Sequence, residues 1–179
     1  MNTYISLLRG INVSGKNLIK MEELRKTFEN EGFSNVKTYL QTGNIIFQTQ
    51  ENNNIILQEK ISNIIKNKFN LDVPNIVLSK EKLETIIENN PFSKEKKTDE
   101  TFLYITFLGE TPKKIDLKQI EEKKFPNEEI FFTDFAVYLY CPSGYGKTKL
   151  TNNFLETKLK VLATTRNWKT TNEIMNLFG

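Results

Sequence analysis

Arginine is scarce in this chain, and two of its copies lie in short segments of unusual composition. The 25 Lys+Arg residues include only three arginines. Arg9 stands in the segment 9–12, and Arg166 stands in the segment 164–168 beside the single tryptophan, Trp168. A guanidinium presents a planar set of hydrogen-bond donors that lysine cannot reproduce. We therefore expect these two segments to form the working surface of the protein.

The segment around Arg166 has two interpretations. Trp168 could lie over Arg166, because an indole face attracts a guanidinium, and both would then face a ligand together with Asn167. Alternatively, Arg166 forms an ion pair that fixes the last helix, since structural ion pairs are as common as functional ones. The sequence leaves both interpretations open.

The segment 10–17 is similar to a phosphate-binding P-loop. It reads Gly-Ile-Asn-Val-Ser-Gly-Lys-Asn, which is the G-x-x-x-x-G-K-[ST] pattern with Asn17 in place of the final hydroxyl. That hydroxyl would hold Mg²⁺, and the next helical pattern begins late, near Met21. The surrounding pattern also predicts hairpins, whereas a P-loop domain needs alternating parallel strands and helices. A nucleotide-hydrolysing loop is therefore disfavoured.

A more modest role fits the same loop. Arg9, Lys16 and backbone amides could hold an anion. Equally, Gly10 and Gly15 could do no more than shape the loop while Asn12 caps it. The residues do not decide between these two interpretations.

A second near-match to the same pattern lies at 141–148. It keeps Gly-Lys-Thr but has Cys141 where the first glycine belongs. We expect Thr148 to act as a cap and the Pro and two Gly to form turns; Lys147 and Lys149 would be the donors if the loop binds an anion. Cys141 has no His or evident base near it in sequence, so we expect a packed side chain and not a nucleophile.

Gln41, Thr42, Gly43 and Asn44 form a short connection between two predicted strands. Gly43 suits a positive backbone angle, so a turn explains the segment. The amides of Gln41 and Asn44 both donate and accept hydrogen bonds, which suits recognition better than chemistry.

The composition excludes several classes of protein. The 179 residues contain no His and one Cys, which rules out Ser-His-Asp and Cys-His triads, His metal sites, thiolate clusters and internal disulfides. A net charge of +3 permits nucleic acid without demanding it. No apolar run approaches a membrane span, and the segment 1–5 lacks the basic region of a signal peptide. We expect a cytoplasmic protein with no metal, no cofactor and no membrane partner.

Hydrophobic periodicity predicts the same order of elements twice. In the first half, strands are expected at 3–8, 36–40, 44–48 and 73–78, with helices at 21–28 and 57–69, the first ending in a Schellman motif at Gly32 and Phe33. A helix capped by Ser79 and a charged stretch at 93–100 follow. In the second half, strands are expected at 102–108, 129–133, 135–140 and 161–164, with helices from Thr111 and at 150–158, and a last helix at 170–178 capped by Thr170.

Two βαββαβ units in series predict an α+β fold of tandem ferredoxin-like halves, with antiparallel or mixed sheets and a C-terminal helix. The predicted division is 1–79 for the first half, 80–100 for the linking helix and charged loop, and 101–179 for the second half with the C-terminal helix. The residues of the two halves are not visibly alike, so the duplication would be one of topology.

Three segments together resemble a known family. They are Leu-Leu-Arg-Gly-Ile-Asn-Val at 7–13, Thr-Tyr-Leu-Gln-Thr-Gly-Asn at 38–44 and Ala-Thr-Thr-Arg-Asn-Trp at 163–168. In this order, over essentially the whole chain, they are similar to the bacterial domain-of-unknown-function family numbered 1697. The resemblance implies a small cytoplasmic α+β protein with ferredoxin-like halves and no established activity, substrate or cofactor. The chain departs from the family at Ser14, where glycine is usual and an unusual backbone angle would favour it, and at Thr42, where serine is usual.

The predicted site is a cluster of loops that binds a small phosphorylated or carboxylated ligand. Its members are Arg9, Gly10, Asn12, Lys16, Gln41, Asn44, Arg166, Asn167 and Trp168. The hypothesis requires the loops after the first strand, at the hairpin and before the last helix to converge on one pocket. No catalytic constellation is visible, so we lean against an enzyme, although one that uses Asp or Glu with Lys stays open.

Two alternatives stay open beside the small ligand. Lysines at 94–97, 113–114, 123–124 and 147–149 could line a nucleic-acid groove, although solvated faces explain most of them and no RNP-type motif is present. A protein-interaction module without catalysis is the other alternative. Oligomeric state and motion between the halves are not specified by the sequence.

Overall fold

The computed structural model describes residues 1–95 and 98–178 and divides into two compact units. The first unit is Met1–Glu84 together with the last residues from Ile174 onward, and the second is Thr85–Glu173. Across the described residues the chain forms two four-stranded antiparallel sheets and six α-helices, so the predicted α+β class is confirmed. No helix in this described part is both long and apolar enough to cross a membrane.

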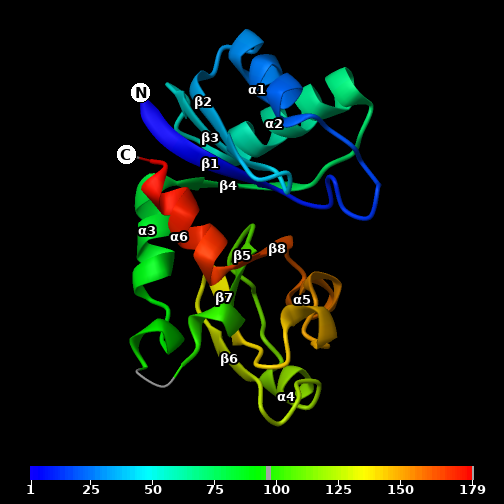
Figure 1. Ribbon diagram of the computed structural model, residues 1–179, viewed down its shortest axis with the longest axis vertical. Coiled ribbons are helices and arrows are strands. Elements are labelled where there is room, and N and C mark those ends of the chain that lie inside the picture. The colour runs from blue at the N-terminus through cyan, green and yellow to red at the C-terminus, as the bar shows by residue number, and fades with distance from the viewer. Residues whose placement is uncertain (96–97, 179) are drawn as a thin grey trace. The chain divides into compact units, whose positions relative to one another are not determined.

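The first unit is a sheet with two helices on one face (Figure 1). Its elements are β1 (Asn2–Leu8), α1 (Met21–Asn30), β2 (Ser34–Tyr39), β3 (Asn44–Thr49), α2 (Asn54–Phe69) and β4 (Asn75–Ser79). The strands lie in the order β2-β3-β1-β4, and each neighbouring pair is antiparallel. Because β1 is an interior strand, the loop that follows it begins between the neighbouring strands β3 and β4, at one end of the sheet.

The core of the first unit lies between this sheet and its helices. Phe28, Phe33 and Phe47 form a group of rings whose centroids are 4.6 to 6.0 Å apart. Leu57 and Ile61 of α2 are fully buried beside them. Burying aromatic and aliphatic side chains from both helices and the sheet is what fixes the helices on that face.

Helix α1 ends in the predicted Schellman motif. Phe33 N–H donates to the Phe28 carbonyl at 3.2 Å, and Gly32 N–H donates to the Glu29 carbonyl at 3.2 Å. Gly32 has a φ of 89°, which the motif requires. The chain therefore turns sharply from α1 into β2.

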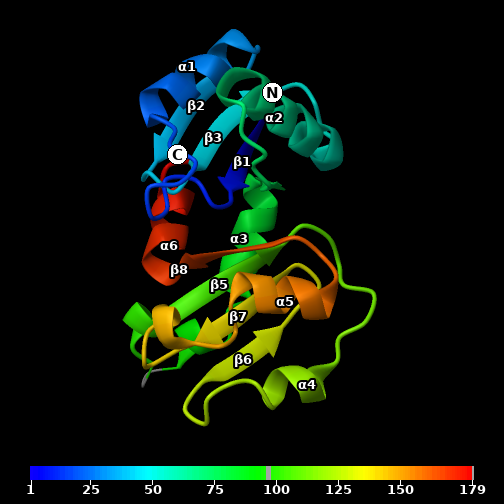
Figure 2. The ribbon, with the colours of Figure 1, turned by 90° about the vertical axis from the view of Figure 1, so that its right-hand side faces the viewer.

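The second unit has the same order of elements around a second sheet (Figure 2). Its elements are β5 (Leu103–Leu108), α4 (Leu117–Glu121), β6 (Glu129–Phe132), β7 (Ala136–Tyr140), α5 (Asn152–Leu159) and β8 (Ala163–Asn167). The strands lie in the order β6-β7-β5-β8, again antiparallel. Val137 and Leu139 of β7 pack with Ile120 of α4 and Leu155 of α5 in one buried cluster.

Two further helices, α3 (Lys80–Glu88) and α6 (Trp168–Asn176), contain the points where the chain passes from one unit to the other. Within the second unit, the Tyr138 hydroxyl donates to the Ile86 carbonyl near the end of α3 at 2.7 Å. Successive residues of a strand face opposite sides of the sheet. The end of α3 therefore covers the face opposite α4 and α5, and burial raises the pKa of Tyr138 to about 12.

The helix expected from Thr111 begins later. The segment 110–116 is a loop, and α4 starts at Leu117. Asp116 Oδ1 accepts a hydrogen bond from Gln119 N–H at 3.2 Å and so caps this helix. Aspartate is one of the preferred residues at a helix N-terminus, and α4 begins directly after Asp116.

The last strand and helix also differ from expectation. The strand expected at 161–164 is β8, Ala163–Asn167, and the last helix begins at Trp168 instead of Thr170. Asn167 Oδ1 accepts a hydrogen bond from Thr170 N–H at 2.7 Å, so Asn167 is the cap. Arg166 consequently lies in a strand and not in a loop.

The charged stretch at 93–100 also carries some local structure. Short 3₁₀ turns form at Phe92–Lys94 and Glu100–Phe102. Lys96 and Lys97 of the predicted 94–97 cluster lie outside the described residues.

Candidate functional site

The loop after β1 closes on itself as a tight turn. Lys16 N–H donates to the Val13 carbonyl at 3.0 Å, and between them Ser14 and Gly15 have φ values of 51° and 73°. Two successive positive φ values are those of a type I′ turn, so Ser14 adopts the left-handed angle for which glycine is better suited. Helix α1 begins only at Met21. The loop therefore does not lead into a helix N-terminus as a P-loop does.

Asn12 ties this loop to the turn between β2 and β3. Its Nδ2 donates to the Ile19 carbonyl at 2.9 Å and to the Gln41 carbonyl at 2.8 Å. Its Oδ1 accepts from Ile19 N–H at 2.9 Å. An amide nitrogen has two hydrogens to donate, so both are in use within the protein.

Gly43 marks the closest approach of the two loops. Its φ is +79°, and a Cβ built on it would lie 2.7 Å from Ile11 Cδ1 and 2.7 Å from Leu8 Cβ. Leu8 N–H also donates to the Gly43 carbonyl at 2.8 Å. Only glycine satisfies both the backbone angle and the contact at this point.

Asn44 holds the hairpin turn from inside. The side chain is fully buried, and its Nδ2 donates to the Tyr39 carbonyl at 2.8 Å and to Thr42 Oγ1 at 3.2 Å. Like Asn12, it therefore uses its two amide hydrogens on the protein itself.

These contacts join residues 9–20 and 40–44 into one assembly, called the loop cluster below. Arg9 is half-buried, with its backbone N–H bonded to the Pro74 carbonyl at 2.9 Å, and Lys16 is exposed. The Gly10 carbonyl accepts from Asn17 Nδ2 at 2.8 Å. The structure thus brings together two of the three segments predicted to converge.

The third predicted segment belongs to the second unit, so we describe it separately. Arg166 Nη1 donates to Thr164 Oγ1 and to the Thr165 carbonyl, both at 3.0 Å. Burial lowers the pKa of the Arg166 guanidinium to about 10, which leaves it charged at neutral pH. Asn167 caps α6, and Trp168 is buried at the start of that helix.

A hollow of about 490 Å³ adjoins Trp168. Its walls include Glu100, Glu173 and a single cation, Lys169. Two carboxylates against one ammonium do not favour an anion there.

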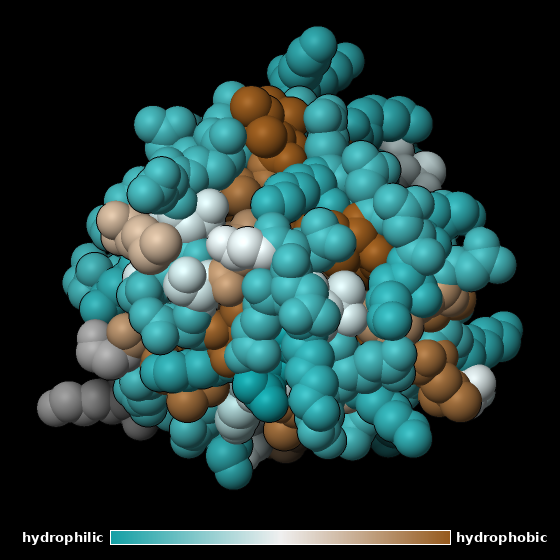
Figure 3. Space-filling view, turned by 90° about the horizontal axis from the view of Figure 1, so that it is seen from above, coloured by the Kyte–Doolittle hydropathy of each residue, from teal (hydrophilic) through white to brown (hydrophobic). Residues whose placement is uncertain are grey.

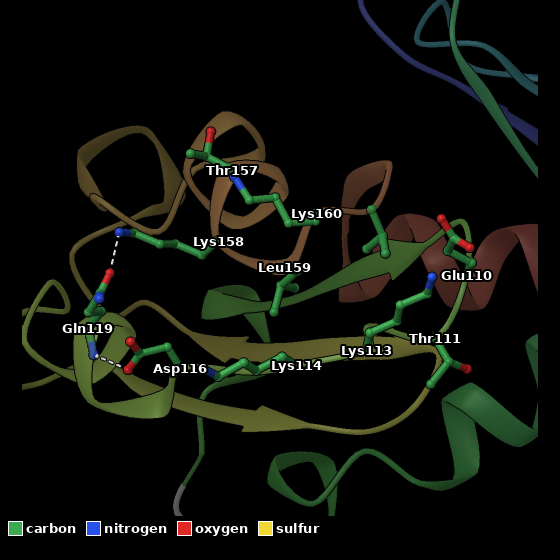
Figure 4. Close-up of a pocket in the computed structure, with 11 residues that line it drawn as sticks. Glu110, Thr111, Lys113, Lys114, Asp116, Gln119, Thr157, Lys158, Leu159 and Lys160 are labelled. Carbon is green, nitrogen blue, oxygen red and sulfur yellow. Dashed lines mark hydrogen bonds between the residues drawn. The ribbon is translucent and has the colours of Figure 1, made fainter.

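The second unit also contains a larger, cationic hollow, called the lysine pocket below (Figure 4). Its volume is about 630 Å³, within the range of small-molecule sites. The loop 110–116 forms one wall, and the end of α5 with residues 160–161 forms the other. The charged lining residues are Lys113, Lys114, Lys158, Lys160, Glu110 and Asp116.

Hydrogen bonds fix the position of one of these lysines. Lys158 Nζ donates to Gln119 Oε1, and it lies 5.9 Å from the centroid of the Phe154 ring. The backbone N–H of Gln119 is held in turn by Asp116 Oδ1. The end of α5 and the start of α4 are thereby joined across the pocket.

Lys160 is placed by the backbone. It ends α5 with a φ of 59° and donates its N–H to the Glu156 carbonyl at 2.8 Å. Glu156 Oε1 then accepts from Ala163 N–H at 2.9 Å, at the first residue of β8. The short link between α5 and β8 is therefore ordered by its own hydrogen bonds.

In the 141–148 segment, Cys141 and Thr148 are buried, whereas Lys147 is exposed. Cys141 is fully buried, and burial, with a smaller contribution from the negative charge of Glu128, raises the pKa of its thiol to about 12. A short 3₁₀ turn, Tyr145–Lys147, follows, and Thr148 Oγ1 accepts from Leu150 N–H at 3.1 Å. Such a thiol is a poor nucleophile at neutral pH.

The lysine pocket was not predicted as a site. The sequence suggests either a nucleic-acid groove or a solvated surface for Lys113 and Lys114, and Lys158 and Lys160 lie in another segment of the chain. A doubled lysine in a loop and two lysines at a helix end were the available signals, and neither indicates a hollow by itself. Within the described residues, no three His, Cys, Asp or Glu side chains group as a metal site would need.

Comparison with known proteins agrees with the sequence motifs. No curated protein matches the chain. Among solved structures it is similar to a conserved bacterial protein from Streptococcus pneumoniae, with 27% identity, a TM-score of 0.73 and coverage of 99% of both chains. Residues 1–138, which include the whole loop cluster, match the family described as a protein of unknown function, DUF1697. As its motifs predicted, the chain belongs to the DUF1697 family, for which no activity is established.

Proposed function

We propose that this protein binds a small anionic ligand, phosphorylated or carboxylated, in the lysine pocket. The observation that carries the proposal is four lysines around a hollow of about 630 Å³ that holds only two carboxylates. Like charges gathered at one place repel one another, and a bound anion relieves that repulsion. The pocket is thus better suited to an anion than the hollow beside Trp168.

The pocket contains more than charge. Gln119 adds an amide, whereas Leu159 and Val161 also line the pocket but are almost fully buried in the core. Lysine acts as a mobile point charge, whereas arginine offers a fixed fork. The pocket therefore suits an anion that is held by several point charges and one amide.

The loop cluster keeps its predicted role in a narrower form. Arg9 and Lys16 remain the proposed donors to an anion there, while Asn12 and Asn44 position the loops, since their amide hydrogens already bind the protein. Gly10 would contribute a backbone amide, and Gln41 would contribute its side-chain amide. The binding set of Arg166, Asn167 and Trp168 also remains a proposal, as does its convergence with the loop cluster.

We propose further that both units are ferredoxin-like halves. The strand orders β2-β3-β1-β4 and β6-β7-β5-β8 repeat one antiparallel topology with two helices per sheet, which supports the proposal. The division at 1–79, 80–100 and 101–179, a cytoplasmic location and the absence of catalysis are proposals of the same kind.

Nucleic acid and protein partners are the alternatives. The lysines of the pocket would also attract a phosphate backbone. On the face shown in Figure 3, apolar residues form small separate patches within a hydrophilic surface. A large docking face would show a wide apolar patch, so that face gives no support to a protein-interaction module.

The test is a titration with inorganic phosphate, pyrophosphate, citrate and a short single-stranded DNA. We would run it at about 0.01 M ionic strength, where the Debye length is about 30 Å. Lys113→Ala and Lys158→Ala remove pocket charges, and Lys68→Ala, at an exposed position of α2, removes the same charge elsewhere.

We expect at least one small anion to bind the wild type and the Lys68 variant and to bind both pocket variants more weakly. Equal binding by all four proteins would refute the pocket as the site. Binding of DNA alone would replace the proposal with nucleic-acid association.

A further inference from the structure

Three large aliphatic side chains are exposed on the loop cluster. Val13, Leu18 and Leu40 are 53%, 70% and 50% exposed. Each is next in sequence to Asn12 or to one of the two residues that the Asn12 side chain binds. They belong to the loop that extends beyond the end of β1 in Figure 1 and to the turn bound to it. The three side chains therefore share one small part of the surface.

The structure gives no internal reason for a leucine at position 40. Leu40 has a φ of 58°, a left-handed angle that asparagine or glycine adopts more easily than leucine does. Half of its side chain is in contact with water, so burial does not favour leucine either. A residue that suits neither its backbone angle nor its exposure is best explained by contact with a partner.

The loop cluster also carries positive charge and no negative charge. It contains one arginine, two lysines and no Asp or Glu, so its formal charge is +3. Lys16 and Lys20 are exposed. The next carboxylates in sequence, Glu22 and Glu23, belong to α1, and Glu22 is ion-paired within that helix. The cluster therefore combines exposed aliphatic side chains with exposed cations, which complements a partner that is both anionic and apolar.

A lipid bilayer fits this combination better than a folded protein or a nucleic acid does. Proteins that bind at the bilayer interface place aliphatic side chains at the acyl boundary and lysines near anionic headgroups. A stable protein interface buries about 800 Å² on each partner, whereas the loop cluster offers three aliphatic side chains on short turns. Single-stranded nucleic acid is bound by cations together with aromatic rings, and the loop cluster contains no Phe, Tyr or Trp.

We propose that the loop cluster docks on the surface of an anionic lipid bilayer. The three aliphatic side chains enter the interface, and Lys16 and Lys20 lie at the headgroup phosphates. This contact uses no residue of the lysine pocket, and it names the source of the anion proposed above for the loop cluster. The expectation of no membrane partner rests on the lack of an apolar run, which bears on a membrane span and not on contact with a surface.

The experiment is cosedimentation of the full chain with two kinds of vesicle at about 0.1 M ionic strength. One kind is phosphatidylcholine alone, and the other is an equal mixture of phosphatidylcholine and phosphatidylglycerol. We expect binding to the anionic vesicles, little binding to the neutral ones, and a decline as salt screens the cations. Inorganic phosphate at equal ionic strength should not displace the protein, because a free anion offers no interface to the aliphatic side chains.

Variants of the aliphatic side chains test insertion. Leu18→Ala should weaken binding to anionic vesicles by at least about fourfold, the effect of roughly one buried methylene. Leu40→Asn should also weaken binding but keep the thermal stability of the wild type, because asparagine tolerates the left-handed angle. Ile55→Ala, at a position of α2 that is 66% exposed, is the matched control and should bind as the wild type does.

Variants of the lysines test the charge. Lys16→Ala should weaken binding by roughly fivefold. Lys68→Ala removes the same charge from an exposed position of α2, and Lys158→Ala removes it from the lysine pocket, so both should bind about as the wild type does.

A fluorescence measurement adds a direct readout of insertion. The emission of Leu18→Trp should shift to the blue on anionic vesicles, because an indole that enters the interface leaves water. The emission of Ile55→Trp should not shift. Thermal unfolding without vesicles shows beforehand that each variant is folded.

The failures can be told apart. No binding to anionic vesicles overturns the bilayer contact and leaves an acidic protein as the partner of the exposed side chains. Binding that is equal in the wild type, Leu18→Ala and Leu40→Asn, or that inorganic phosphate abolishes, overturns it in favour of a simple anion site. Loss of vesicle binding in Lys158→Ala alone would move the contact to the lysine pocket. The small-anion titration of that pocket succeeds or fails independently of all these results.

Discussion

The loop cluster and the lysine pocket use polar side chains in opposite ways. In the loop cluster, the amide hydrogens of Asn12 bind backbone carbonyls, and those of Asn44 bind the Tyr39 carbonyl and Thr42 Oγ1. At Gly43 a Cβ would collide with the side chains of Ile11 and Leu8. In the pocket, Lys113 and Lys160 are exposed around a hollow. The difference teaches that distinctive sequence motifs can serve to hold loops in place. Ordinary surface lysines, which form no motif, can line a candidate binding site.

Gly43→Ala should have the largest effect on stability. It tests whether the contact between the two loops of the loop cluster stabilises the fold. A left-handed angle costs a residue with a Cβ roughly 1–2 kcal/mol, and overpacking against Ile11 and Leu8 adds roughly 1–3 kcal/mol. We expect the free energy of unfolding to fall by about 2–5 kcal/mol in urea denaturation.

Gly10→Ala is the matched control for that substitution. Gly10 has a φ of +73° but nothing within 4 Å of an added Cβ, so only the cost of the angle applies. Equal losses in the two variants would show that the contact between the loops contributes nothing to stability.

Asn12→Ala should come next. It removes three hydrogen bonds to Ile19 and Gln41, and net contributions of this kind predict a loss of roughly 1–3 kcal/mol. Thermal unfolding measures this loss of stability, with Lys16→Ala, at an exposed position in the same loop, as the control. An Asn12 variant of full stability that had lost anion binding would break the comparison, because the amide would then be a ligand donor.

Two buried titratable groups of the second unit, Tyr138 in β7 and Cys141 just after it, add a comparison that depends on pH. Folding raises the pKa of Cys141 from 9.0 to about 12, chiefly by desolvation, and the pKa of Tyr138 from 10.0 to about 12 for the same reason. A raised pKa means that the protonated group favours the folded state, so this stability is complete below pH 9 and is lost as the pH rises toward 12.

We therefore expect the urea midpoint to hold from about pH 7 to about pH 9 and to fall above that. Tyr138→Phe, which lacks the titrating hydroxyl, should show a shallower fall than the wild type. A midpoint that drops only at acid pH, with none of this alkaline loss, would contradict the burial of both groups.

Much of the fold was predictable because its signals are local. The apolar run of β1 predicts a strand that is buried on both faces. The spacing of Leu57 and Ile61 in α2 follows from burial of one face of that helix. Gly32 and Phe33 specified the end of α1. The errors lie at helix starts, where Asp116 and Asn167 compete with Pro112 and Thr170 as start signals and sequence alone does not rank them.

The candidate pocket was less predictable for a physical reason. Lys113 and Lys158 line one pocket only because α5 and the loop after β5 pack on neighbouring parts of one sheet, and no local pattern encodes that arrangement. An exposed lysine has the same sequence context on a convex surface as beside a hollow. Asn12 shows the converse limit, because sequence can single out its motif but cannot assign that motif to loop structure or to ligand binding.

Lys113→Ala should have the smallest effect on stability. It tests whether the lysine pocket is free of residues that the fold depends on. The side chain is exposed at the rim of the pocket. A surface substitution of this kind changes the free energy of unfolding by no more than about 0.5 kcal/mol. Removing one of four neighbouring cations also relieves repulsion, so the sign should be neutral or slightly stabilising at low salt, and the difference from Lys68→Ala should vanish as salt screens the charges. A Lys113 variant that lost stability as Asn12→Ala does would place this lysine among the constructional residues, and the distinction between the two regions would then no longer hold.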